Sequence, residues 1–317
     1  MSAHAAHLIY IKKFLYKRNS QHCMQEKISE DYKKAGNIAH QALQYGKELI
    51  RPGAKLLEVS EKVEKRIAEL GGELAFPVQI SCDEIAAHYC ADPDDPLVFE
   101  KQVACLDVGV HVNGAIGDNA LTVDLSREHG DLVKASREAL EAAAEILGPG
   151  VTLGKIGRAI QDAIEGRGFS PVRNLSGHGL DLYNIHAYPQ IPNYDTADDS
   201  ILENGMFIAI EPFATDGAGM IYETERANIF SLGEKRPVRN PITRQVLKEI
   251  EKYKGLPFTT RWLARKFPLF RVRLALREMK QLEMLKEYPP LPDKNKGLVS
   301  QAEDSFYISD EAECLTK

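Results

Sequence analysis

The sequence has few cysteines, and they follow no recognisable pairing pattern. Its five cysteines form an odd set without a C-x-x-C pair, which argues against a disulfide framework and against a structural zinc site. The chain also lacks an excess of positive charge, since its net charge is -6. It therefore has no overall electrostatic attraction for nucleic acid, although residues 261–280 are locally basic. We therefore expect a reducing compartment and no specific nucleic-acid partner.

Long apolar runs are missing as well. Lys12 and Lys13 interrupt the apolar patch 7–15, which leaves neither a signal-peptide core nor a membrane span. We interpret residues 1–27 as a leader without regular structure and residues 28–317 as one catalytic domain. The chain has 317 residues, of which 44% are hydrophobic, so it can bury a large core without disulfides. We expect a cytoplasmic monomer without a membrane partner.

The spacing of apolar residues predicts two pairs of helices. The first pair covers 29–49 and 56–70, and the second covers 132–147 and 153–164. In each pair a Pro-Gly sequence separates the helices, and glycines lead into an extended segment. This repeated order predicts an α+β fold with two halves related by a pseudo-twofold axis, and a crevice between the halves is the natural place for a site.

A third segment breaks the repeated order. Residues 233–292 are charged and are expected to be mostly helical, with one basic helix-like stretch over 262–286. Extended sequence resumes at 298–308. We interpret residues 233–292 as a helical subdomain inserted into the second half.

The strongest local signal is a hairpin whose turn is Asn113-Gly114, the preferred dipeptide of a two-residue type I′ turn. Counting outward from this turn places Gly109 opposite Asp118, with Asp107 as its diagonal neighbour on the same face. Diagonal neighbours lie about 7 to 8 Å apart, close enough for both side chains to reach one pair of metal ions. The flanking residues are apolar and a poor place for solvated charge, so we interpret both aspartates as metal ligands rather than surface residues.

Three more polar residues in the second half lie in apolar or glycine-rich surroundings: His178, Glu211 and Glu303. Each alone would be read equally well as a satisfied polar group of the core. Together with the two aspartates they supply four carboxylates and one imidazole. Such a set, made mostly of oxygen ligands, suits Mn, Fe or Co.

Five motifs follow one another along the chain in addition to the hairpin: FPVQISCDEIAAHY, SGHGL, AIEPFATDGAG, GLPFTTRWL and VSQAED. These motifs resemble those of type 2 methionine aminopeptidases, the archaeal and eukaryotic class with the pita-bread fold. The resemblance implies that the inserted subdomain is winged-helix-like. The resemblance covers residues 28–317.

The same resemblance assigns roles to the ligands. Asp107 would chelate one metal ion, Asp118 and Glu303 would bridge two, and His178 and Glu211 would complete the coordination of the second metal ion. Two divalent ions, Co, Mn or Fe with Zn as a further candidate, would generate a bridging hydroxide that attacks the first peptide bond.

Other residues would handle the substrate. The resemblance implies that His88 and His186 contact it and that one of the two, His88 or His186, stabilises the oxyanion. It also implies that Glu211 carries protons and that Phe76 and Ile185 are walls of the methionine pocket. As lone residues the two histidines would be read as structural. Cys90, just past His88, predicts sensitivity to thiol reagents.

The expected activity is removal of the initiator methionine from nascent polypeptides with a small second residue, with transient contact to the ribosome. Two alternatives stay open. One is a related Xaa-Pro aminopeptidase or dipeptidase, and the other is a non-catalytic pita-bread paralogue that binds the ribosome or RNA.

Overall fold

The computed structural model describes residue 27 and residues 29–317, so the predicted leader lies outside it except for its last residue. No helix in this described part is long and apolar enough to span a bilayer. After a first helix over 29–49, the elements are α2 Leu56–Glu69, β1 Glu73–Leu74, β2 Gln79–Cys82, β3 Val103–Val112, β4 Ala115–Asp124, α3 Gly130–Ile146, α4 Leu153–Gly166, β5 Ser170–Pro171, β6 Ser176–Asp181, β7 Asn184–Pro192, β8 Phe207–Ile210, β9 Phe213–Thr215, β10 Ile229–Leu232, α5 Pro241–Ile250, the 3-10 turn Glu251–Tyr253, β11 Phe258–Thr259, α6 Thr260–Ala264, α7 Leu269–Gln281, β12 Leu285–Tyr288, β13 Val299–Gln301, β14 Asp304–Tyr307 and β15 Glu313–Cys314.

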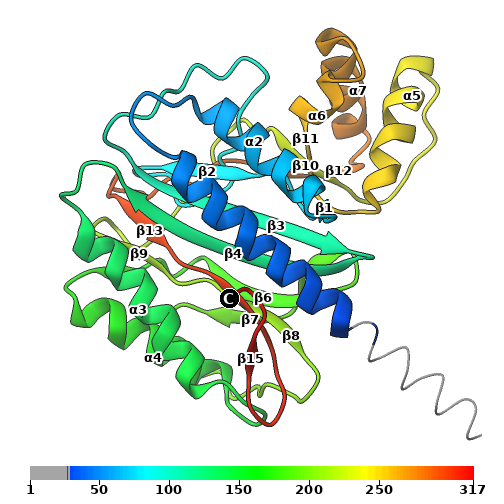
Figure 1. Ribbon diagram of the computed structural model, residues 1–317. Coiled ribbons are helices and arrows are strands. Elements are labelled where there is room, and N and C mark those ends of the chain that lie inside the picture. The colour runs from blue at the N-terminus through cyan, green and yellow to red at the C-terminus, as the bar shows by residue number, and fades with distance from the viewer. Residues whose placement is uncertain (1–26, 28) are drawn as a thin grey trace, which may run out of the picture.

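Each half consists of a helix pair packed on sheet, as Figure 1 shows. In the first half, the helix over 29–49 and α2 pack on strands ordered β1-β3-β2, with β4 paired to β3. In the second half, α3 and α4 pack on two sheets, ordered β13-β9-β5 and β15-β14-β8-β6-β7. The predicted α+β arrangement and all four predicted helices are confirmed, with boundaries that differ by at most two residues from the predicted ones.

Helix α4 illustrates why these segments are helical. The Thr152 side chain accepts a hydrogen bond from the Lys155 amide, which caps the helix start. Ile156, Ile160 and Ile164 recur at helical spacing and are fully buried against the sheet. Burying each of these side chains stabilises the fold by about 1.5–3 kcal/mol. Gly168, at φ +81, then turns the chain toward β5.

A pair of backbone hydrogen bonds joins the two halves beside the predicted ligands. The amide of Ala120 in β4 donates to the carbonyl of Glu303 at 3.2 Å, and the Glu303 amide donates back to Ala120 at 3.0 Å. An antiparallel rung of this kind fixes both residues relative to each other. It places a predicted ligand of the second half directly beside the hairpin that carries the two aspartates.

Residues 229–288 form a third group with its own core. Strands β10, β11 and β12 make a small sheet on which α5, α6 and α7 pack, at the upper right of Figure 1. The prediction of one helical stretch over 262–286 is wrong. The helix stops at Ala264 and restarts after Pro268, whose ring restricts the preceding residue and removes an amide donor. The last predicted helical residues instead form β12, which pairs with β10.

Candidate metal centre

The hairpin folds with the predicted register. Asn113 and Gly114 both have positive φ, 53° and 95°, as a type I′ turn requires. Gly109 lies opposite Asp118, and Asp107 lies opposite Ala120. The two carboxylates therefore project from the same face of adjacent strands.

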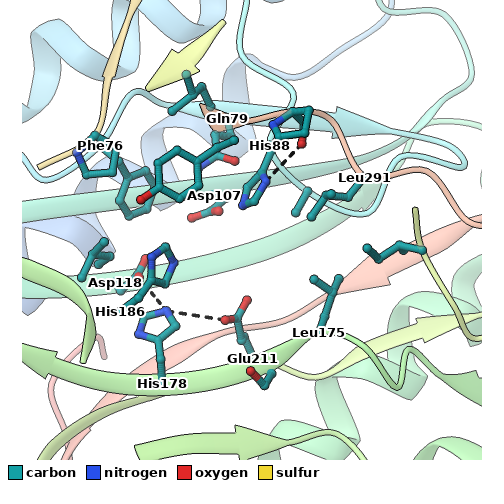
Figure 2. A pocket seen from close by; sticks show the side chains of 18 of the residues that line it. Phe76, Gln79, His88, Asp107, Asp118, Leu175, His178, His186, Glu211 and Leu291 are labelled. Atoms are coloured by element: carbon teal, nitrogen blue, oxygen red, sulfur yellow. Dashed lines mark hydrogen bonds and ion pairs between the residues drawn. The ribbon is translucent and has the colours of Figure 1, made fainter. Parts of the chain in front are cut away.

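Strands of the second half bring the other three residues to this face. His178 lies in β6, Glu211 directly follows β8, and Glu303 precedes β14. The Nε2 atom of His178 is 3.8 Å from Oδ2 of Asp118 and 3.5 Å from Oε1 of Glu211. Asp118, His178 and Glu303 each offer one ligand atom, and these atoms lie within 4.8 Å of one another. Figure 2 shows four of the five predicted ligands around one space.

The carboxylates are buried together, which is costly unless a cation is present. Asp118 and Glu303 are each 2% exposed. One oxygen of each, and Oδ1 of Asp107, has no hydrogen-bond partner. Burial raises the pKa of Asp107 to about 7. Burial and mutual repulsion raise the pKa values of Asp118, Glu211 and Glu303 well above those of free carboxyl groups.

The orphaned acceptors and the mostly oxygen donor set fit divalent cations. His178 is held in the form that a metal ligand requires. Its Nδ1 lies 3.2 Å from the carbonyl oxygen of Gly179, and because a carbonyl only accepts, Nδ1 carries the proton and Nε2 presents a lone pair to the carboxylates. Burial lowers the His178 pKa to about 4, so the ring is neutral at pH 7.

Gln301 is a part of the centre that the sequence analysis missed. Its Nε2 donates to Oε2 of Glu211 at 3.4 Å and to Oε2 of Glu303 at 3.3 Å. One amide thus orients two predicted ligands. Its position two residues before Glu303 on an extended segment was a usable signal, because residues i and i+2 face the same side.

Metal binding is expected to release protons and to strengthen between about pH 6 and 8. The raised carboxyl pKa values mean that the metal-free cluster retains protons near neutrality, and a cation must displace them. His178 contributes no proton to this release, because its ring is already neutral near pH 7. Titration calorimetry with Mn²⁺ in two buffers of different ionisation enthalpy should report about one proton or more released per protein at pH 7. Binding heats independent of the buffer would contradict this.

A cavity of about 460 Å³ lies against the cluster and is lined by both halves and by the 229–288 segment. Its walls include the predicted pocket residues Phe76 and Ile185, and His88 and His186 also line it. The His186 ring lies 4.8 Å, centroid to centroid, from that of His178. All nine predicted site residues therefore border one space.

The tautomer of His88 follows from its surroundings. Its Nδ1 lies 3.2 Å from the carbonyl oxygen of Pro289 and must donate to it. Burial lowers the His88 pKa, so the ring is neutral and Nε2 is an acceptor. His88 can therefore accept a hydrogen bond from a substrate N–H through Nε2. The assignment of the oxyanion contact to His88 or His186 stays a prediction.

The burial of Cys90 contradicts the expectation that this residue makes the site sensitive to thiol reagents. The side chain is 3% exposed and packs against Ile229 and Tyr288 rather than lining the cavity. Burial raises the pKa of the Cys90 thiol. A protonated, inaccessible thiol reacts slowly.

The glycines of the SGHGL motif let His178 approach its neighbours. A Cβ on Gly179 would lie 2.1 Å from the carbonyl oxygen of Tyr188, and one on Gly177 would lie 2.4 Å from that of Ala209. Both contacts are with backbone, which cannot move aside easily. These two positions therefore exclude side chains for steric reasons.

Gly179→Ala is expected to destabilise the protein by roughly 1–3 kcal/mol and to weaken metal binding, because the strand that carries His178 must shift. Gly166→Ala is the control, since a Cβ there meets nothing within 4 Å. Urea denaturation and metal content would measure both effects. Equal behaviour of the two variants would contradict the steric argument.

A carboxylate and imidazole cluster at the junction of two α+β halves is the arrangement of a metallopeptidase. The model of metallopeptidase family M24 matches residues 30–239, and the chain belongs to this family, with its pita-bread fold.

Curated relatives between 34% and 46% identical to the chain are methionine aminopeptidases. The one from Archaeoglobus fulgidus is 46% identical over 295 residues, covering 92% of this chain and 99% of its own. The one from Methanocaldococcus jannaschii is 44% identical over 287 residues, covering 90% and 95%. The crystal structure of a methionine aminopeptidase from Thermotoga maritima matches with a TM-score of 0.67 and 25% identity, covering 91% and 96%. The predicted resemblance to the archaeal class is confirmed.

Proposed function

We propose that the protein removes the initiator methionine from nascent polypeptides whose second residue is small. The observation that carries the proposal is the cluster of buried carboxylates and one imidazole at the base of a cavity with apolar walls. This arrangement combines a cation site with a cavity that is partly lined by apolar side chains.

In this proposal Asp107 would hold one cation, Asp118 and Glu303 would be shared by two, and His178 and Glu211 would complete the coordination of the second cation. Two divalent cations held there would supply a hydroxide nucleophile near neutral pH and would polarise the scissile carbonyl. Mn, Fe and Co suit the ligand set, and Zn is compatible with it.

The remaining residues bind the substrate and move its protons. Glu211 takes a proton from the nucleophile and passes it to the leaving amine. His88 accepts a hydrogen bond from a substrate N–H through Nε2. His186, on the neighbouring wall of the cavity, is the donor available for the oxyanion.

The apolar part of the cavity receives the methionine side chain. Phe76, Ile185 and Tyr288 line it. Phe76 packs over Gly109, where a Cβ would lie 2.1 Å from the ring, so this wall depends on glycine beneath it.

We also infer that residues 28–317 are one catalytic domain of a cytoplasmic monomer, that 233–292 is a winged-helix-like insertion, and that contact with the ribosome is transient.

The test is hydrolysis of Met-Ala-Ser by metal-free protein titrated with Mn, Fe or Co under anaerobic conditions. Activity should appear with metal and should be absent in Asp118→Ala. Ala-Pro-Ser, the substrate type of the proline-specific alternative, should remain intact. Folded, metal-loaded protein that cleaves neither peptide would overturn the proposal in favour of a binding protein.

A further inference from the structure

His88 has an unusual backbone conformation for a residue with a side chain. Its φ is +66°, in the left-handed region, which residues with a side chain seldom adopt and which persists only where the surroundings enforce it. Before His88, the Ala86 amide donates to the Leu291 carbonyl at 2.9 Å, and the Leu291 amide donates to the Ala87 carbonyl at 3.2 Å. One side of the turn is therefore held by backbone.

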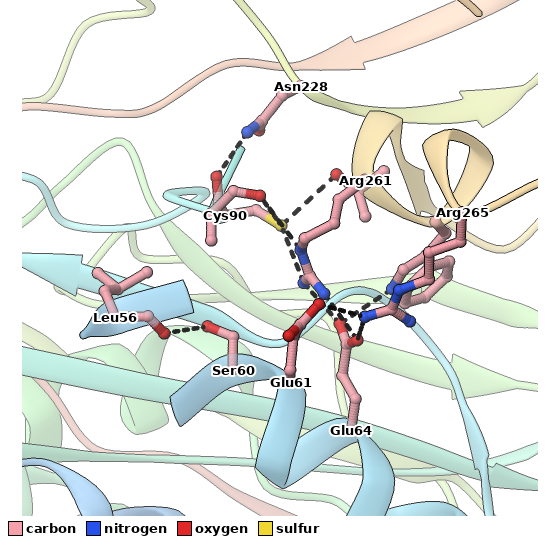
Figure 3. A network of polar contacts seen from close by, with 11 residues as sticks. Leu56, Ser60, Glu61, Glu64, Cys90, Asn228, Arg261 and Arg265 are labelled. Carbon is pink, nitrogen blue, oxygen red and sulfur yellow. Dashed lines mark hydrogen bonds and ion pairs between the residues drawn. The ribbon is translucent and has the colours of Figure 1, made fainter. Parts of the chain in front are cut away.

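The other side of the turn is held by backbone and by side chains. The Ile80 amide in β2 donates to the Tyr89 carbonyl at 2.9 Å. Nδ2 of Asn228 donates to the Cys90 carbonyl at 2.5 Å, and Nε of Arg261 donates to the Ala91 carbonyl at 3.3 Å. Figure 3 shows Asn228 above Cys90 and Arg261 beside it. Arg261 belongs to α6, so the 229–288 segment contacts the chain immediately after His88.

Arg261 is itself held rigidly. Its Nη1 and Nη2 donate to the two oxygens of Glu64 in α2, at 2.8 and 2.7 Å. The indole of Trp262 donates to the same carboxylate at 2.9 Å. Arg261 is 2% exposed and Glu64 is 5% exposed. A bidentate pair fixes the guanidinium plane, and with it the direction in which Nε points.

Stability alone does not explain this pair, because a buried ion pair contributes little more than a well-packed apolar pair of similar volume. What an apolar pair lacks is the fixed donor directed at Ala91. We propose that Arg261 is a positioning residue that locks the turn at His88, so that the 229–288 segment holds a substrate-contacting residue in place. The inference rests on the substrate contact proposed for His88.

The experiment is a mutant cycle on kcat/KM for Met-Ala-Ser. Glu64→Leu with Arg261→Met removes the pair without stranding a charge, and it is made in the wild type and in His88→Ala. In the wild type we expect kcat/KM to fall about ten- to a hundredfold, as for a misplaced site residue. In His88→Ala the same change should lower it less than about twofold, because the residue being positioned is already absent.

Arg265→Met is the matched control. Arg265 also donates to Glu64, at 3.3 Å, but its other contact is Glu61 rather than the segment after His88. It should leave kcat/KM unchanged, and melting curves and metal content would verify the fold of every variant. An equal loss in both backgrounds, or no loss in the wild type, would overturn the positioning role. Full activity in His88→Ala alone would instead overturn the proposed contact of His88, and the inference with it.

Discussion

Glu303→Gln is expected to lower kcat/KM for Met-Ala-Ser by more than about a hundredfold. Loss of a group that merely orients a metal ligand already costs about 10- to 100-fold, and Glu303 is placed among the ligands themselves. Its carboxylate is 2% exposed, with one oxygen lacking any hydrogen-bond partner. An amide keeps the shape but removes the negative charge, so metal content should fall together with activity.

Asp304→Asn is the control, because it changes the adjacent residue in the same way. Asp304 is also buried, but its Oδ1 accepts from Thr316 at 2.8 Å and its Oδ2 lies 3.4 Å from Arg137. We expect it to retain metal and activity. If both variants lost activity equally, the effect would belong to the strand and not to the predicted metal centre.

Glu64→Leu is expected to lower the free energy of unfolding by about 3–5 kcal/mol, because it leaves the Arg261 guanidinium buried without its counter-charge. Adding Arg261→Met should recover most of this loss, since the double variant buries no unpaired charge. Urea denaturation curves at constant metal concentration would measure both changes.

The neighbouring acid on the same helix serves as the reference. Glu61 pairs with Arg265 at 3.0 Å, with side chains about half exposed. Such a pair contributes about 0–1 kcal/mol, so Glu61→Leu should have little effect. A loss on Glu64→Leu no larger than on Glu61→Leu would show that the buried pair is not a major source of stability.

The part of the centre that local rules determine could be predicted from sequence. The Asn113-Gly114 turn fixes the register of the hairpin, and the register alone determines that Asp107 and Asp118 share a face. The four long helices follow from apolar spacing and Pro-Gly breaks for the same reason. In both cases the residues that determine the structure lie within the element or directly beside it.

What depends on distant contacts could not be predicted. Residues 285–288 form a strand because β10 offers an edge, which the local basic pattern does not reveal. The tautomer of His88 depends on Pro289, 201 positions away. Arg261 and Glu64 are 197 positions apart, and nothing in either neighbourhood indicates a pair.

The antiparallel backbone pair of Ala120 and Glu303 also has a consequence for how the protein unfolds. The first half supplies Asp107 and Asp118 and the second supplies His178, Glu211 and Glu303, so neither half alone holds the full proposed ligand set. Cations held there would act as a cross-link between two separately packed cores. Because a ligand that binds only the assembled state stabilises that state, we expect bound metal to couple the unfolding of the two cores into one cooperative event.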